Sequence, residues 1–134
     1  MSPFWFGGEL NGKQANCDGN FPYETGKGPY LERPSVMGSY GANPFGLCDQ
    51  HGQVWESCQD CFGPEQDWYE DEDEDNVCAS WPADPTGASS GSSRVLWGGS
   101  WRHNAVRCRS AYRHGNAPSR RHDSIGFRLL GELR

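Results

Sequence analysis

The 134-residue sequence lacks a long hydrophobic run, and hydrophobic residues make up only 34% of it. No apolar stretch approaches the roughly 20 residues that a membrane-spanning helix needs. The start of the chain also lacks the basic segment and long apolar stretch of an export signal. We therefore expect no membrane insertion and a cytoplasmic location by default, with surface display open if the chain is part of a larger protein.

Helical periodicity is also missing. No stretch longer than about ten residues keeps a 3.6-residue period free of Gly or Pro. The 18 glycines and nine prolines instead predict turns and irregular loops, and six Trp, five Tyr and six Phe predict a core of large rings. Residues 51–58, 93–97 and 125–130 are the candidate strands. At this length, we expect residues 1–134 to form a single domain.

Charge is distributed unevenly along a chain whose net charge is −6. Nine of the 18 acidic residues lie between Asp60 and Asp75, whereas seven arginines lie between Arg102 and Arg128. Residues 63–92, rich in Asp, Glu, Gly, Ser and Pro, are predicted to form one long surface loop. Its acidic run is typical of a solvated loop; folding against the arginines or binding cations are the alternatives. The negative net charge disfavours nucleic acid as a partner.

Six cysteines allow three disulfides in an oxidising compartment, but without an export signal reduced thiols are the default. A zinc site around Cys58 and Cys61 is disfavoured because the chain has no second Cys-x-x-Cys. The six are Cys17, Cys48, Cys58, Cys61, Cys78 and Cys108.

Separated motifs along the chain carry a family resemblance. They are QANCDGNFPY (14–23), NPFGLCDQHGQVWE (43–56), DPTG (84–87), RVLWGGSW (94–101), CRSAYR (108–113) and IGFR (125–128). In type and order they resemble the formylglycine-generating-enzyme, or sulfatase-modifying-factor, family. The resemblance implies an α+β, C-type-lectin-like fold of short strands, extensive irregular loops and little helix. The half-domain that usually opens the family has no counterpart here, so we expect a fragment or a minimal version of the fold.

The resemblance implies one Ca²⁺ site within residues 49–56. Two carboxylates and two backbone carbonyls would supply hard oxygen ligands, which suit Ca²⁺ rather than zinc. The candidate ligands are Asp49, Gly52, Val54 and Glu56. The same residues could instead cap or salt-bridge a turn without metal. A second family site is not expected, because Lys27 and no acid stands beside Gly28.

Oxidase chemistry depends on two positions after the Gly-Gly-Ser-Trp turn. The family's aerobic oxidases bind copper(I) there with two cysteines five residues apart, a ligand pair that soft Cu(I) prefers. Aligned on residues 98–101, those positions hold His103 and Cys108 in this chain. Only one thiolate remains, so no copper is expected and Cys108 is predicted to be a small buried residue. A metal-dependent cysteine oxidase using Cys108 and His103 is the enzymatic alternative.

Residues 102–128 alternate framework residues with irregular positions, all of which lie within 102–124 and include Gly115 and Ser124. This pattern resembles the variable regions of proteins diversified by retroelements. Mutagenesis of adenines in AAC codons cannot yield Lys, Glu, Gln, Met or Trp, and none of these occurs between Arg102 and Arg128. An ordinary basic surface of an undiversified member is the alternative. The predicted contact residues are Trp97, Trp101, Arg102, His103, Asn104, Arg107, Tyr112, His114, Asn116, Ser119, Arg121, His122 and Asp123.

Taken together, the sequence predicts a non-catalytic ligand-binding protein. Residues 97–128 would hold the binding region, because His, Arg, Tyr and Asn on a rigid scaffold offer hydrogen bonds and stacking at limited entropic cost. The expected ligand is another macromolecule, most simply a protein. A further alternative is an interaction domain of a larger kinase or surface protein.

Overall fold

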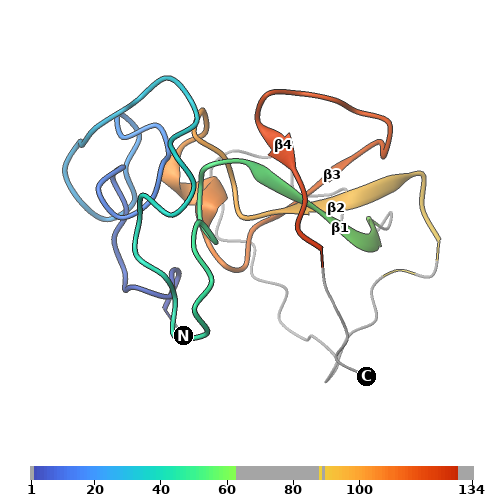
Figure 1. The fold of residues 1–134 in the computed structure, drawn as a ribbon, viewed down its shortest axis with the longest axis horizontal. Coiled ribbons are helices and arrows are strands. Elements are labelled where there is room, and N and C mark those ends of the chain that lie inside the picture. Colours follow the sequence, from blue (N-terminus) through green and yellow to red (C-terminus); the bar gives the residue numbers. More distant parts are fainter. Residues whose placement is uncertain (1, 63–87, 89, 130–134) are drawn as a thin grey trace.

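A computed structural model describes residues 2–62, 88 and 90–129 of the chain. Its elements are β1 (Trp55–Phe62), β2 (Ser93–Trp97), a 3-10 helix η2 (Ala105–Cys108), β3 (Arg113–Asn116) and β4 (Ile125–Gly126). Figure 1 shows irregular loops of the N-terminal residues on one side, the sheet on the other and η2 beside the loops. Among the described residues, no helix is long and apolar enough to cross a membrane.

The four strands form one sheet in the order β3-β2-β1-β4. Strands β1 and β2 are antiparallel, as are β2 and β3, whereas β4 pairs with β1 in parallel. The β1–β2 register shifts between Ser57 and Cys61, which marks a β-bulge or irregularity. Because β3 and β4 lie at opposite edges of the sheet, the segment that joins them crosses from one edge to the other.

The prediction of a strand at 93–97 is confirmed, but the neighbouring strands differ from expectation. The strand predicted at 51–58 begins only at Trp55 and continues to Phe62. Positive φ angles at Gly52 (70°) and Gln53 (64°) keep the preceding residues in a turn. The strand predicted at 125–130 is two residues long, and Leu130 lies outside the described residues. Strand β3 was not predicted, because Arg-His-Gly-Asn has no apolar alternation.

The predicted acidic loop falls largely outside the described residues, which omit 63–87 and 89. The loop therefore stays a prediction. Of the six cysteines, the five in the described part of the chain are free thiols, and Cys78 lies outside it.

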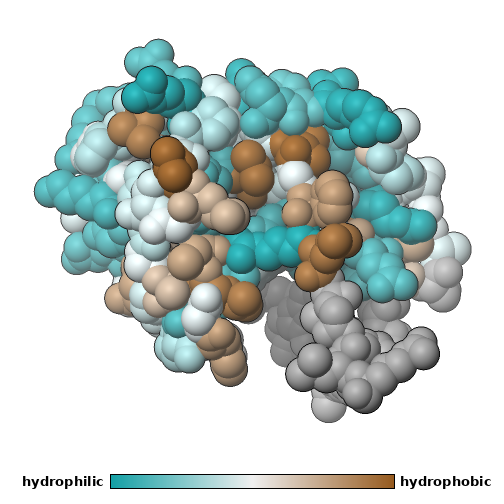
Figure 2. Space-filling model, viewed as in Figure 1, coloured by the Kyte–Doolittle hydropathy of each residue, from teal (hydrophilic) through white to brown (hydrophobic). Residues whose placement is uncertain are grey.

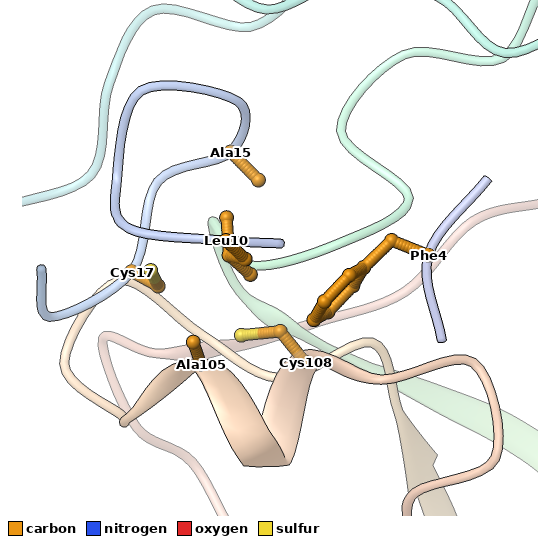
Figure 3. Close-up of a cluster of buried hydrophobic side chains, with 6 residues drawn as sticks. All are labelled: Phe4, Leu10, Ala15, Cys17, Ala105 and Cys108. Atoms are coloured by element: carbon orange, nitrogen blue, oxygen red, sulfur yellow. The ribbon is translucent and has the colours of Figure 1, made fainter. Parts of the chain in front are cut away.

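A core cluster joins the N-terminal loops to η2 (Figure 3). Phe4 is its largest member, with 1% of its surface exposed, and its ring lies 5.3 Å from Phe6, 5.7 Å from Tyr23 and 5.4 Å from His51. The other members are Leu10, Ala15, Cys17, Ala105 and Cys108. The core thus combines an aromatic ring with small residues that let the loops approach η2 closely.

Candidate functional site

The Gly-Gly-Ser-Trp turn after β2 sets the position of the predicted binding residues. Gly99 has a φ of 76°, and a Cβ there would lie 2.5 Å from Cys108 Sγ, so only glycine fits. The Gly52 N–H donates to the Gly98 carbonyl at 2.6 Å, and the Trp101 N–H donates to the Gln53 carbonyl at 2.9 Å. These bonds fix the turn to the segment that precedes β1.

Arg102 follows this turn, and its exposed side chain is held by contacts with three neighbouring residues. Its guanidinium carbon lies 5.5 Å from the centre of the Trp101 ring, and Nη1 lies 3.1 Å from His122 Nε2 and 3.6 Å from Asp123 Oδ1. A guanidinium only donates, so His122 Nε2 accepts. On its other side, His122 Nδ1 lies 2.6 Å from Asp123 Oδ1, 2.8 Å from Ser124 Oγ and 3.3 Å from the Ser124 backbone nitrogen.

His103 follows directly and lies half-buried, with Nδ1 2.6 Å from the hydroxyl of the buried Ser100. Burial is the largest of the causes that lower its pKa to about 4, and the neighbouring Arg107, Arg102, His114 and His122 contribute the rest. The imidazole is therefore neutral at neutral pH.

Trp55 forms the buried floor beneath three of the predicted contact residues. Its surface is 3% exposed, and its ring lies 5.5 Å from His103, 6.0 Å from Tyr112 and 5.7 Å from His114. These residues come from the turn after β2 and from β3 and its approach. The sheet therefore brings together side chains that are separated in the sequence. Trp55 itself was not among the predicted contact residues.

The remaining predicted contact residues differ in accessibility. Ser119, Arg121 and Asp123 are exposed, and the rest are half-buried: Trp97, Asn104, Arg107 and Asn116. Trp101 is buried, with 9% of its surface exposed, and lies beneath Arg102 rather than on the surface.

Some of the half-buried residues hold local structure. The Asn104 side chain accepts from the Arg107 N–H at 3.3 Å and caps η2. Trp97 donates from Nε1 to the Ser110 carbonyl at 2.8 Å, and its ring lies 6.2 Å from that of the buried His51. These side chains therefore also stabilise the fold.

Two of the irregular positions in the sequence belong to the framework. A Cβ on Gly115 would come within 2.4 Å of the Phe62 ring. Ser124 is buried, and its carbonyl accepts from the Trp55 N–H at 2.8 Å. Side-chain variation at these two positions would disturb the sheet.

Cys108 lies at the centre of the core with 0% of its surface exposed. A hydrogen bond with the Cys17 thiol and burial both raise the pKa of the Cys108 thiol well above its ordinary value. Figure 3 shows the two cysteines in the same cluster. Cys17 lies in a distant motif of the sequence, so only the fold reveals it as a second thiol beside Cys108.

The predicted calcium ligands form a polar junction before β1. Asp49 Oδ2 accepts from the Gly38 N–H at 2.8 Å, whereas Asp49 Oδ1 is buried without a hydrogen-bond partner. Arg128 Nη2 lies 2.6 Å from Glu56 Oε1 and 3.0 Å from the Asp49 carbonyl. The unpartnered Asp49 oxygen fits a cation, but Glu56 already has a counter-charge.

The two predicted carbonyl ligands, Gly52 and Val54, lie in the same junction. Gly52 has a φ of 70° and lies in the turn before β1, and Val54 packs against Gly126 of β4, where a Cβ would lie 3.1 Å from Val54 Cγ2. Within the described ranges, no three side chains of His, Cys, Asp or Glu gather as a metal site. The calcium site stays a prediction.

Comparison with protein families gives one match that spans almost the whole chain. A family model described as sulfatase-modifying factor enzyme 1-like domain matches residues 4–133. The chain is 41% identical over 95 residues to the serine/threonine-protein kinase pkn1 of Chlamydia pneumoniae, covering 71% of this chain and 14% of that protein. It is 34% identical over 118 residues to the formylglycine-generating enzyme of Streptomyces coelicolor, covering 85% of this chain and 34% of the enzyme.

Solved structures with the same fold include Treponema denticola variable protein 1, with a TM-score of 0.56 and 31% identity. That match covers 72% of this chain and 31% of the other. PvdO from Pseudomonas aeruginosa matches with a TM-score of 0.51 and 32% identity, over 71% of this chain and 33% of its own. The fold is thus C-type-lectin-like, with short strands, irregular loops and little helix. The chain spans about a third or less of the length of each relative.

Proposed function

Because the chain belongs to the sulfatase-modifying factor enzyme 1-like family, whose members include enzymes and a variable protein, we propose that it is a binding protein. In this proposal, residues 97–124 form a contact surface for another protein. The likeness to the T. denticola variable protein supports a diversified version of this surface. The likeness to pkn1 supports an interaction domain within a larger protein.

One observation carries the proposal: the backbone of residues 97–124 is anchored from below while exposed side chains project from it. Trp101, Ala105, Cys108 and Ser124 are buried, with at most 9% of their surface exposed. Arg102, Ser119, Arg121 and Asp123, which lie between these anchors, are exposed. A rigid backbone with variable exposed side chains is what a binding surface needs to change its specificity without refolding.

The state of Cys108 favours binding over oxidase chemistry. Thiolate character makes a cysteine a nucleophile or a copper ligand, and burial with a raised pKa opposes it. The nearby Cys17 does supply a second thiol, so catalysis is tested directly. The chain is incubated with Cu(I), oxygen and a Cys-x-Pro-x-Arg peptide. Aldehyde formation on the peptide would overturn the proposal.

The binding proposal makes a prediction about tolerance to substitution. Joint replacement of Arg102, Ser119, Arg121 and Asp123 by other polar residues should change the free energy of unfolding by less than about 1 kcal/mol. Single replacements at framework positions should each lower the free energy of unfolding by more. The Cβ of Gly115→Ala would clash with Phe62, and Ser124→Val would replace a buried hydroxyl that contacts His122 with an apolar group. Urea unfolding of the variants measures both effects.

The diversified version is tested at the genetic locus. We expect a near-identical template repeat and a reverse-transcriptase gene nearby, with substitutions confined to codons for the exposed contact residues. If the locus contains neither, diversification is wrong. For the substitution experiment, an equal loss of unfolding free energy at exposed and framework positions would show that the surface does not tolerate substitution.

A further inference from the structure

Positive charge dominates the contact surface. Between residues 102 and 124 the sequence has six arginines and three histidines but only one acid, Asp123. Asp123 already pairs with Arg102 and lies 2.6 Å from His122 Nδ1. The segment is therefore strongly basic in a chain whose net charge is −6. This local charge is opposite to that of the molecule as a whole.

Arg102 is prepared for binding in a way that an isolated surface arginine is not. Trp101 lies under its guanidinium, and His122 and Asp123 hold one edge. Its side chain nevertheless keeps 43% of its surface exposed. An arginine held in place loses less conformational entropy when it binds, and its planar fork matches a carboxylate.

A group of cationic and titratable side chains surrounds this arginine. We define the basic cluster as Arg102, His103, Arg107, His114 and His122. The Trp55 ring lies 5.5 Å from His103 and 5.7 Å from His114, and Arg102 Nη1 lies 3.1 Å from His122 Nε2. All four other members also contribute to the lowered pKa of His103. The buried Trp55 ring supports this group from below, and Tyr112 packs against the same ring. An anionic group placed there would interact favourably with Arg102, whose side chain is exposed.

We infer that the basic cluster binds an acidic segment of a partner protein, with a carboxylate seated on Arg102. The inference rests on the proposed binding function and names the chemistry of its ligand. An acidic peptide fits better than nucleic acid, because the chain's overall negative charge repels a long polyanion whereas a short acidic segment engages only the cluster.

The test uses a synthetic peptide of sequence Glu-Asp-Glu-Asp-Glu-Asp as the probe. Residues 70–75 of this chain have the same sequence, so a variant with these six acids replaced by Gln and Asn is studied beside the natural chain. Amide and imidazole NMR signals are followed during titration. We expect the largest shifts at residues of the basic cluster, an affinity that falls as salt rises, and no binding of Gln-Asn-Gln-Asn-Gln-Asn.

Substitution of the anchor gives the decisive comparison. Arg102→Gln should weaken binding by at least about tenfold, and Arg102→Lys should weaken it less, because charge remains while the planar fork is lost. Arg33→Gln is the matched control: it removes the same charge from an exposed arginine outside the contact surface and should change the affinity by less than about twofold. Unfolding curves confirm that each variant folds.

The possible outcomes separate this inference from the proposed function. Equal weakening by Arg102→Gln and Arg33→Gln, or tighter binding of a single-stranded oligonucleotide than of the peptide, overturns the acidic-protein ligand. If neutral peptides selected from a display library shift the same residues and the acidic peptide does not, the ligand class is wrong and the binding function stands. If no library member shifts residues 97–124, the binding function fails as well.

Discussion

His51 and His103 are imidazoles whose hydrogen bonds or burial keep them neutral, and both lie at junctions of the fold. The Nδ1 of His51 is 2.7 Å from the Cys108 carbonyl, so it donates, and Nε2 accepts from the Trp5 N–H at 3.3 Å. A second proton on His51 would face the Trp5 N–H without an acceptor. Burial lowers the pKa of His51, and burial together with neighbouring cations lowers that of His103 to about 4.

These shifts predict a loss of stability in mild acid. Above pH 6.5 His103 is neutral in both states and its contribution is complete. Below pH 6.5 the unfolded chain takes up a proton that folded His103 resists, so the free energy of unfolding falls until about pH 4. Urea unfolding between pH 7.5 and pH 4.5 should therefore show a smaller slope for His103→Gln than for the natural chain. His122→Gln, at an exposed histidine, is the control, and equal slopes for all three would contradict the prediction.

At the scale of elements, the Gly-Gly-Ser-Trp turn is the joint between sheet and η2. Gly99→Ala should reduce the free energy of unfolding by more than about 2 kcal/mol, since its φ of 76° disfavours alanine and the new Cβ meets Cys108. Gly8→Ala is the control, because that glycine is exposed and a Cβ there has no neighbour within 4 Å. The midpoint of urea unfolding compares the two. A similar cost for both would show that the turn relaxes freely.

The N-terminal segment is predicted to be an integral part of the core. Phe4→Ala should destabilise the fold by about 3–5 kcal/mol, because its buried ring packs against Phe6, Tyr23 and His51. Phe45→Ala, at a phenylalanine with 87% of its surface exposed, should have little effect. Thermal unfolding distinguishes the two, and equal melting temperatures would mean that the segment docks only loosely.

Local sequence signals predicted some elements and missed others for physical reasons. Strand β2 was predicted from its β-prone sequence Arg-Val-Leu-Trp, and in the structure its Val95 and Leu96 are buried. Strand β3 carries no such signal and exists through its pairing with β2. The family motifs predicted the fold, and Arg102 and His103 were among the contact residues predicted from the same resemblance. Neither the floor at Trp55 nor the contact of Cys17 with Cys108 could be predicted, because both depend on long-range packing.

At the scale of the whole molecule, a polar junction links the irregular loops to β1 and to the segment that follows β4. Arg128, just after β4, binds Glu56 of β1 and the Asp49 carbonyl, while Asp49 also accepts from the Gly38 N–H. The Glu56 carboxylate is thus neutralised by an arginine from the far end of the chain, whereas at Asp49 that arginine reaches only the backbone carbonyl. Among the described residues, Asp49 Oδ1 is one of two buried side-chain oxygens left without a hydrogen-bond partner, the other being Asn16 Oδ1. The unpartnered Asp49 oxygen is the reason to expect a cation here.

Calcium bound at this junction would stabilise the entire fold, because its ligands are assembled only when the loops and β1 are in place. An ion present at about 100 times its dissociation constant adds about 2.7 kcal/mol. Chelation should therefore lower the melting temperature and added Ca²⁺ should restore it, whereas Asp49→Asn should abolish this dependence and Asp18→Asn should keep it. A melting temperature unchanged by chelation would show that Arg128 alone balances Glu56 and that the predicted site is wrong.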